Sequence, residues 1–360
     1  MTDFKLKTIS SVCVISLLLG ILSGCSNSGK DGKRYEASFL ELFDTMTTVV
    51  GYAESEEDFR ADVEKIHTEL LELHQLYDIY NNYEGINNIK TINDNAGVRP
   101  VTVDRRIIEL LLFSKEAYEL TGGRVNVAMG RVLSIWHAYR TAGVDDPEHA
   151  RLPSQSDLES ASLHTDIGSL VIDEDASTVY LSDPESMLDV GSIAKGYATE
   201  QVCRRARAGL LVSVGGNVRA TGAKNSNGDP WIVGIQDPRG ETGVYLHTVN
   251  VTNVSVVTSG SYQRYYTVDG KQYCHIIDSE TLWPSDRYLS VTIITADSGL
   301  ADVLSTALYT MSLDDGLALI TSLDDTEASW VLPDGSVKYS GEGYREYIKD
   351  ENSSSVSLGI

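Results

Sequence analysis

Apolar residues at three- and four-residue steps predict helices in the first half of the chain. The clearest amphipathic stripe comprises Val63, Ile66, Leu70, Leu73 and Tyr77. A second stripe ends at Thr121-Gly122-Gly123, a typical helix C-terminus. The helices expected in this half are 55–80, 103–121, 125–140 and 154–162. Residues 36–53, rich in Thr, Val and aromatic side chains, predict a strand, and the Asn- and Gly-rich residues 81–100 predict a loop.

The second half of the chain is patterned mainly as short strands separated by Gly, Asn and Asp turns. The expected strands are 169–173, 178–181, 210–214, 218–222, 231–236, 244–250, 253–258, 262–268, 272–277, 289–295, 328–332 and 337–340. Helices are expected within 188–209, after a strand end and a Gly-containing turn, and at 299–311 and 314–322. This order favours an α+β fold, with an N-terminal helical segment packed on mixed or antiparallel sheets, over a regular βαβ series.

The first residues have the pattern of a targeting signal. Lys5 and Lys7 precede an apolar run at 12–22, which is too short for a comfortable membrane span. The run ends in Leu-Ser-Gly-Cys25, which resembles a bacterial lipobox; an ordinary signal or a chance Cys is the alternative. We therefore expect the protein to be lipid-anchored at the extracytoplasmic face of the cell membrane. The expected parts are a lipoprotein signal peptide (1–24), a lipid anchor and flexible tether (25–35), a globular domain (36–341) and a polar C-terminal tail (342–360).

Charge and cysteine content narrow the range of functions that the sequence allows. Asp and Glu number 52 against 29 Lys and Arg, a formal charge of −23, which disfavours nucleic-acid binding. An anionic ligand would need a local cation or a helix N-terminus. Cys203 and Cys274 lack the spacing of a zinc site or redox pair; a disulfide between them is possible, but isolated cysteines are more often buried apolar residues. No GxGxxG or Walker motif is present.

The segment Asp189-Val-Gly-Ser-Ile-Ala-Lys195-Gly196-Tyr is the most informative local pattern. It predicts a strand that runs into a tight turn and a helix that opens at once. Free N–H groups at such a helix start suit a phosphate, and Lys195 supplies positive charge. The alternative is an ordinary turn in which Asp189 caps the helix and Lys195 is solvated.

Two further patterns offer chemistry. Asp302 and Thr306 would lie one turn apart on one helix face, where a carboxylate and a hydroxyl provide the hard oxygen ligands that Mg²⁺ prefers. The alternative is a buried Asp–Thr hydrogen bond. His275, with Asp278 at the same strand end, is a candidate general base or phosphate donor, although a lone strand histidine is more often structural.

Together, and in this order, these segments resemble the FAD:protein FMN transferase family, also called the ApbE family, over roughly residues 38–340. The matching segments are Phe43-Asp44-Thr45, Tyr80-Asn81 with Ile92-Asn93, 121–126 with Trp136, 189–197, 215–219 with Gly222, 231–238, 258–264, 275–278 and 301–306. One such motif alone would be weak evidence for the family, but a series of them in the family's order is specific to it.

The resemblance implies an ApbE-like, T-fold-related architecture and an extracytoplasmic, often lipid-anchored enzyme. It would bind FAD and Mg²⁺ and transfer FMN to a Thr or Ser hydroxyl of an acceptor protein, releasing AMP. It implies Asp302, Thr306 and a backbone oxygen of Ser192 as metal ligands. It also implies His275 as the catalytic base, with Asp302 as the alternative. The FAD contacts it implies are Phe43, Tyr80, Arg124, Val125, Asn126, Asp189, Lys195 and Ile276.

The sequence also departs from the family pattern. Phe43-Asp44 replaces the Met-Gly of the family, and Asn126 stands where many members have Asp. Residues 278–284 lack the Pro and Gly of the family's Asp-Pro-x-Thr-Gly, so the turn that they form is expected to be rebuilt. FAD hydrolysis to FMN and AMP, or flavin binding without catalysis, are the alternative functions. Acceptors in the family favour an Asp-Gly-(x)-Thr/Ser-Gly-Ala-Thr-like segment. None is found in this chain, so self-flavinylation is not expected.

Overall fold

The structure, a computed structural model, describes residues 32–351. Several expected features lie outside the described residues: the signal peptide, the lipidation site Cys25, most of the tether and the end of the tail. Within them, no helix has the length and apolar character needed to cross a membrane.

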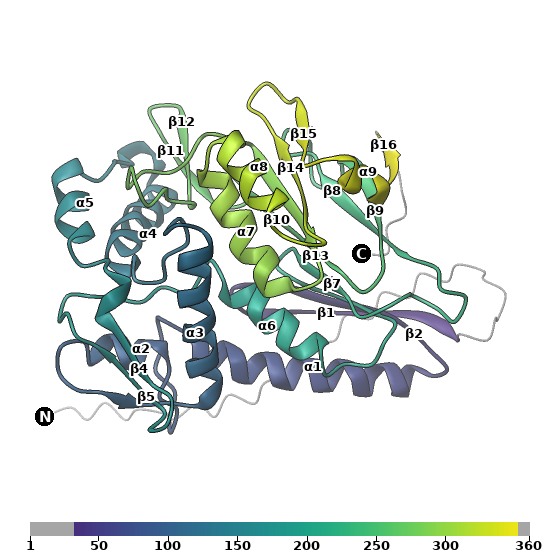
Figure 1. The fold of residues 1–360 in the computed structure, drawn as a ribbon, viewed down its shortest axis with the longest axis horizontal. Helices are drawn as coiled ribbons and strands as arrows, with labels where there is room; N and C mark the ends of the chain where they lie inside the picture. The colour runs from purple at the N-terminus through teal and green to yellow at the C-terminus, as the bar shows by residue number, and fades with distance from the viewer. Residues whose placement is uncertain (1–31, 352–360) are drawn as a thin grey trace, which may run out of the picture.

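An eight-stranded antiparallel sheet forms the centre of the molecule (Figure 1). Its strands, in spatial order, are β1 (Lys33–Leu42), β2 (Thr45–Ala53), β6 (Leu210–Val214), β7 (Asn217–Ala220), β10 (Ser255–Gly260), β13 (Ser290–Thr295), β14 (Glu327–Val331) and β15 (Val337–Tyr339). The fold is therefore α+β with antiparallel sheets, as the order of the predicted elements indicated.

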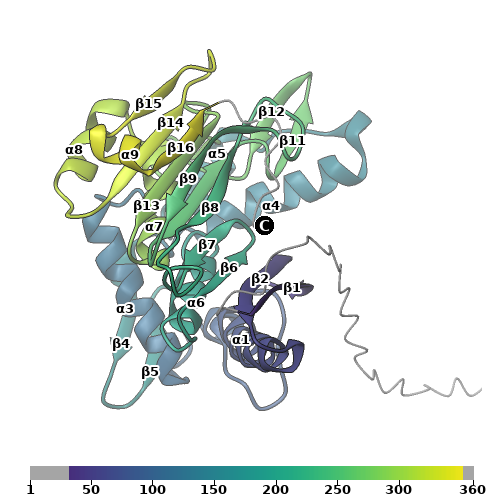
Figure 2. The same ribbon diagram turned by 90° about the vertical axis from the view of Figure 1, so that its right-hand side faces the viewer.

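Side chains alternate between the two faces of this sheet. Each face packs into a separate apolar core, so both faces are covered. Val49 and Ile293 belong to a core shared with helices α1 (Glu56–Tyr77), α6 (Ala194–Cys203) and α7 (Ser298–Thr310). Their neighbours Val50 and Ile294 belong to a second core, shared with the small sheet β16-β9-β8. The strands of the small sheet are β8 (Trp231–Gln236), β9 (Tyr245–Val251) and β16 (Ile348–Glu351). The result is a helix layer, a large sheet and a small sheet (Figure 2).

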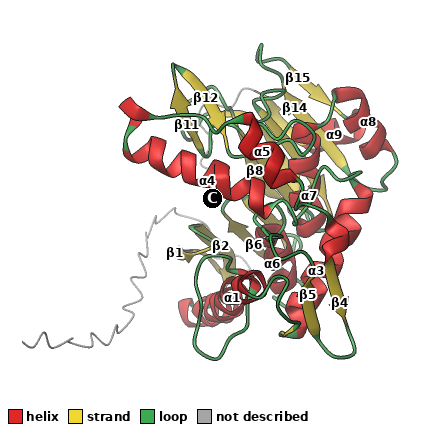
Figure 3. Ribbon diagram, turned by 90° about the vertical axis from the view of Figure 1, so that its left-hand side faces the viewer, coloured by secondary structure: helices red, strands yellow, loops and turns green. Residues whose placement is uncertain are grey.

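A second group of elements lies at one end of the central sheet, to the left in Figure 1 and again visible in Figure 3. These elements are α2 (Ile89–Asp94), α3 (Arg105–Leu120), α4 (Gly130–Asp145), α5 (Gln155–Ser162), β3 (Val101–Thr102), β4 (Leu170–Asp173), β5 (Thr178–Leu181), β11 (Tyr265–Val268) and β12 (Lys271–Cys274). Two single-turn 3₁₀ helices lie at Pro147–His149 and Ile167–Ser169. Trp136, Leu158 and Tyr266 form a third apolar core that joins α4 and α5 to the β11–β12 hairpin.

Three predictions about the first half of the chain were wrong in detail. Residues 36–53 form two strands, because Phe43 and Asp44 make a two-residue turn with φ of 54° and 52°. A turn of this kind is normally signalled by Asn-Gly, Asp-Gly or Gly-Gly, so Phe43-Asp44 lacked the usual turn signal. The expected loop 81–100 contains α2, whose N-terminus is closed by an Asn88–Thr91 capping box. The helix expected at 125–140 runs from Gly130 to Asp145.

The expected polar tail is part of the fold up to residue 351. Residues after 341 form α9 (Glu342–Tyr347) and β16, which pairs with β9. Tyr344 is fully buried, and its hydroxyl lies 3.1 Å from His247 Nε2. The expected tether also ends earlier than predicted, because β1 begins at Lys33. Cys203 and Cys274 are both buried and free, so the possible disulfide is not formed.

Candidate active site

A cavity of about 740 Å³ opens beside the start of α6 and reaches α4, α7, the β6–β7 turn and the end of β12. This volume is typical of a pocket for a small ligand. The predicted site residues that line it are Tyr80, Arg124, Val125, Asn126, Asp189, Ser192, Lys195, His275, Ile276, Asp302 and Thr306. Phe43 does not line it. The ring of Phe43 packs edge-on against His74 of α1, and its neighbour Asp44 faces the cavity instead.

The start of α6 forms one wall of this cavity. The Asp189 carboxylate accepts the Gly191 N–H at 2.8 Å, and Lys195 Nζ donates to the Gly191 carbonyl at 3.2 Å. The N-cap residue Ile193 makes no side-chain cap, and Asp189 accepts from Gly191 and not from α6, so the alternative in which Asp189 caps the helix does not hold. The strand expected just before the turn is absent as well. Most N–H groups at this helix start are already used: those of Ile193 and Ala194 donate to the Val190 carbonyl, and that of Gly196 donates to Asp302. The positive charge that this wall offers to an anion therefore comes from Lys195.

Asp302 and Thr306 face the same cavity from α7. Asp302 is buried, and its Oδ2 accepts the backbone N–H of Gly196 at 2.8 Å, not the Thr306 hydroxyl. Burial raises the pKa of the Asp302 carboxyl, while Lys195 and the Gly196 N–H act in the opposite direction. A charged Asp302 therefore gains from a nearby cation.

The donor set around Asp302 suits Mg²⁺. Among residues 32–351, no group of three or more His, Cys, Asp or Glu side chains could hold a metal ion. Asp302, Thr306 and Ser192 nevertheless present a carboxylate, a hydroxyl and further oxygens to one cavity. Mg²⁺ is commonly bound by one or two carboxylates together with water and substrate phosphates, so the residues present fit this ion.

His275 is held as a neutral imidazole. Its Nδ1 lies 3.2 Å from the carbonyl oxygen of Arg264. A carbonyl only accepts, so Nδ1 carries the proton and Nε2 is an acceptor. Burial lowers the pKa of His275 to about 3, assisted by the charges of Lys195, Arg264 and Arg140.

Arg140 and Arg264 were not assigned a role from the sequence. Arg140, near the end of α4, belongs to no motif, and Arg264 appeared only within the segment 258–264. Desolvation lowers the pKa of Arg140, and the nearby charge of Arg264 adds to this effect. A chain with a formal charge of −23 thus concentrates cations around one cavity, which favours an anionic ligand there.

Arg124 faces the cavity in an ion-pair network with the rebuilt turn at 278–284. It pairs with Asp278 at 3.2 Å and with Glu280 at 2.7 Å. Leu282 adopts φ of 64° in this turn, and its carbonyl accepts the Trp136 indole N–H at 2.8 Å. The turn thus forms without the glycine of the family pattern, and Arg124 carries two carboxylate partners.

The remaining predicted contacts shape the wall. The Asn126 side chain donates to the Thr165 carbonyl and accepts the Ala128 N–H, each at 2.9 Å, so it fixes the loop before α4. Val125 and Ile276 are buried apolar residues of the wall. Tyr80 is 51% exposed, and its hydroxyl lies 3.1 Å from His137 Nδ1.

Comparisons with known proteins agree with this arrangement. The sequence model of the ApbE family matches residues 43–330. A protein of Treponema pallidum named FAD:protein FMN transferase is 31% identical over 355 residues, covering 92% of this chain and 95% of its own. A Klebsiella pneumoniae protein of the same name is 30% identical over 250 residues, covering 68% and 75%.

Solved structures give the same result. The crystal structure of the ApbE protein from Thermotoga maritima is similar with a TM-score of 0.77 and 28% identity, over 88% of this chain and 100% of its own. The fold is thus similar to that of a known ApbE protein, and the chain belongs to the ApbE family.

Proposed function

We propose that this protein is an FAD:protein FMN transferase that moves FMN from FAD to a Thr or Ser hydroxyl of an acceptor protein and needs Mg²⁺ to do so. The observation that carries the proposal is the placement of Lys195, His275 and the Asp302–Thr306 pair around one cavity. The names of the Treponema and Klebsiella relatives support flavin transfer to protein. FAD and an acceptor protein are therefore the expected partners.

In the proposed reaction, the acceptor hydroxyl oxygen attacks the phosphorus on the FMN side of the FAD pyrophosphate. The bond from this phosphorus to the bridging oxygen breaks, and AMP leaves with that oxygen. The hydroxyl proton passes to a base. Mg²⁺, when bound, would neutralise charge on the pyrophosphate, and Asp302, Thr306 and Ser192 would hold it.

The Lys195 ammonium group would bind the pyrophosphate. His275 is the proposed base, because its Nε2 is an acceptor, whereas the Asp302 carboxylate would hold the metal. In the ligand-free protein, burial, assisted by three neighbouring cations, holds the pKa of His275 far below that of a useful base. A bound pyrophosphate would offset the part of this shift that the cations cause, and so raise the pKa of His275 toward the range of a useful base.

Incubation with FAD, Mg²⁺ and an acceptor domain that carries an Asp-Gly-x-Thr-Gly-Ala-Thr segment, followed by intact-mass measurement, tests the activity. We expect a covalent FMN adduct on the acceptor and an equal amount of AMP. Free FMN and AMP without an adduct would establish FAD hydrolysis instead. Bound FAD that stays intact would indicate a flavin carrier, although Asp302 and Thr306 both facing the cavity argue against this outcome.

We also propose that the enzyme acts at the extracytoplasmic face of the cell membrane, anchored by a lipid on Cys25. The Leu-Ser-Gly-Cys25 sequence supports this. Cys25→Ala should leave the precursor unprocessed or release the protein from the membrane. Unchanged partitioning of this variant into the detergent phase of Triton X-114 would show that Cys25 is not the anchor.

A further inference from the structure

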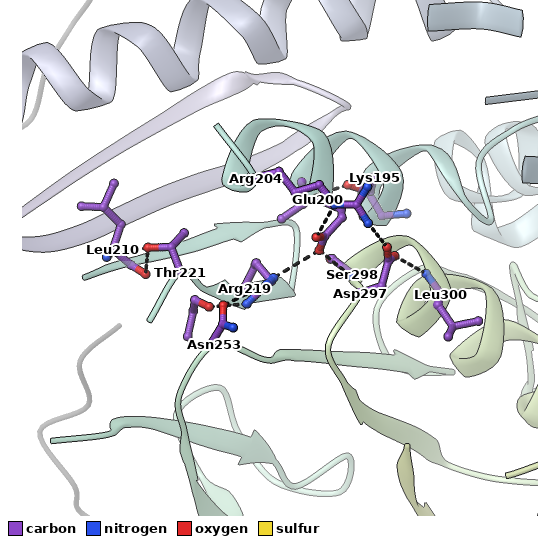
Figure 4. Close-up of polar contacts among 12 residues, drawn as sticks. Lys195, Glu200, Arg204, Leu210, Arg219, Thr221, Asn253, Asp297, Ser298 and Leu300 are labelled. Carbon is purple, nitrogen blue, oxygen red and sulfur yellow. Dashed lines mark hydrogen bonds and ion pairs between the residues drawn. The ribbon is translucent and has the colours of Figure 1, made fainter. Parts of the chain in front are cut away.

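Behind the cavity lies a buried carboxylate that the proposed reaction does not use. Glu200 of α6 is only 4% exposed. Its Oε2 accepts the Ser298 backbone N–H at 2.9 Å and pairs with Arg219 Nε at 3.1 Å, and its Oε1 pairs with Arg204 Nε at 2.9 Å (Figure 4). A carboxylate removed from water is costly unless it is paired and hydrogen-bonded, and here both oxygens have partners.

Glu200 forms the second of two links between α6 and α7. The first joins the Gly196 N–H to Asp302, and the second joins Glu200 to the Ser298 N–H. Glu200 follows Gly196 by four residues, and Ser298 precedes Asp302 by four, so the links are one helical turn apart and the helices run in opposite directions. Asp302 therefore lies one turn from the point at which Glu200 holds α7.

The link also attaches both helices to the central sheet. Arg219 lies on β7 and is largely buried, and it donates to the Ala220 carbonyl and to Asn253 Oδ1. On the other side, Arg204 bridges Glu200 to Asp297, the residue that caps α7 by accepting the Leu300 N–H. Glu200 thus connects α6, the first residue of α7 and β7 at one point.

We propose that Glu200 is a positioning residue for the metal site. It fixes the start of α7 against α6 and so sets the separation between Lys195 and the Asp302–Thr306 pair. The inference rests on the proposed function, because it takes this pair as the magnesium ligands. Residues that orient metal ligands typically change metal affinity or activity by about 10- to 100-fold when they are replaced.

Glu200→Asp is the main test, because it keeps the charge but shortens the side chain by one methylene group. The carboxylate then cannot reach both Ser298 and Arg219 from the same backbone position. With FAD present and no acceptor, we expect the Mn²⁺ dissociation constant, measured by electron paramagnetic resonance, to rise about tenfold. The Mg²⁺ concentration for half-maximal FMN transfer should rise in parallel. The affinity for FAD without metal should stay within about twofold of wild type, because Glu200 does not line the cavity.

Two further variants separate positioning from simple destabilisation. Glu69→Asp is the matched control, since Glu69 of α1 pairs with Arg205, beside Arg204, at 3.0 Å but does not link to α7. It should leave Mn²⁺ affinity unchanged. Arg204→Met removes an exposed partner of Glu200 without disturbing the core, and it should weaken Mn²⁺ binding by about two- to fivefold, less than the change at Glu200 itself.

One outcome would overturn the inference. If Glu200→Asp lowers the melting temperature but binds Mn²⁺ as tightly as wild type, Glu200 only stabilises the fold. If that variant does not fold, unchanged Mn²⁺ affinity in Arg204→Met overturns it equally. A wild-type protein that binds Mn²⁺ more tightly than Glu200→Asp, yet neither transfers FMN nor cleaves FAD, would overturn the proposed function and leave the positioning role intact. If the wild-type protein does not bind Mn²⁺, both the proposed function and the positioning role of Glu200 are overturned.

Discussion

The backbone N–H of Gly196 on α6 donates to Asp302 Oδ2 on α7 at 2.8 Å, so the helix that carries Lys195 also orients the expected metal carboxylate. This contact needs a glycine. A Cβ at position 196 would lie 2.3 Å from the Ser298 carbonyl oxygen and 2.4 Å from Asp302 Cβ. The motif glycine therefore sets the distance between the two helices that line the active site.

Gly196→Ala should push α6 and α7 apart. Neither a backbone oxygen nor a helix Cβ can move aside easily, so we expect a loss of about 1–3 kcal/mol in the free energy of unfolding. FMN transfer should fall at least about tenfold at fixed Mg²⁺ because Asp302 is displaced. Urea unfolding and transfer assays measure these effects. Gly341→Ala is the control, because nothing lies within 4 Å of its added Cβ, and normal Mg²⁺ dependence in Gly196→Ala would contradict this account.

Asp302→Asn should abolish transfer and preserve the fold. The amide oxygen can still accept the Gly196 N–H, but the negative charge that would hold Mg²⁺ is lost. A metal supplies several kcal/mol of transition-state stabilisation, so turnover should drop by at least about a hundredfold. Asp314→Asn, an exposed charge removal on α8 (Leu313–Thr321), should have no such effect. Near-wild-type turnover of Asp302→Asn at limiting Mg²⁺ would show that the metal assignment is wrong.

The site could be predicted where its signal is local in the sequence. Asp302 and Thr306 are one helical turn apart, and Lys195 follows a Gly-containing turn, so both patterns are visible in a few residues. The contact between Glu200 and Ser298 spans 98 residues and involves a backbone N–H, so no spacing could indicate it. Arg140 was missed for a similar reason, because only the fold brings the end of α4 beside His275.

The fold was predictable to a similar extent. Periodicity located α1 and most strands, because each buries a regular face. The Phe43–Asp44 turn was missed because it contains no glycine and because Phe43 is not typical of the left-handed conformation that it adopts. The helix α9 was missed because its burial depends on one side chain, Tyr344, among polar neighbours.

Tyr344→Ala should therefore destabilise a segment that its sequence alone would assign to a solvated tail. The ring is fully buried between the small sheet and β14–β15, stacking on Tyr339 with centroids 5.0 Å apart. Removing a buried aromatic side chain costs about 3–5 kcal/mol. The urea midpoint should fall accordingly, whereas Tyr265→Ala, at a 39% exposed site, should change it little. Equal midpoints for the two variants would mean that the segment after 341 does not contribute to stability.

His275→Gln should reduce the rate of the acceptor step. A positioned base typically contributes about 10²- to 10⁴-fold, so the transfer rate at saturating FAD and acceptor should fall within that range. Affinity for FAD should be nearly unchanged, because in the proposed complex Lys195, and not His275, binds the pyrophosphate. Fluorescence quenching of FAD measures the affinity. A variant that loses FAD binding would identify His275 as a binding or structural residue.

The lowered pKa of His275 also predicts how stability depends on pH. The unfolded histidine binds a proton near its ordinary pKa of about 6.5, whereas burial and three neighbouring cations lower the folded pKa to about 3. Between these values the unfolded histidine binds more protons than the folded one, so the contribution of His275 to the free energy of unfolding falls as the pH decreases through this window. His275→Asn removes this contribution. His247, whose pKa burial lowers to about 4, is present in both proteins and cancels in the comparison.

The stability advantage of wild type over His275→Asn, measured by urea unfolding in FAD-free buffer, should therefore shrink steadily from pH 7 to pH 4. A difference that does not change with pH would show that His275 is not held neutral by its surroundings.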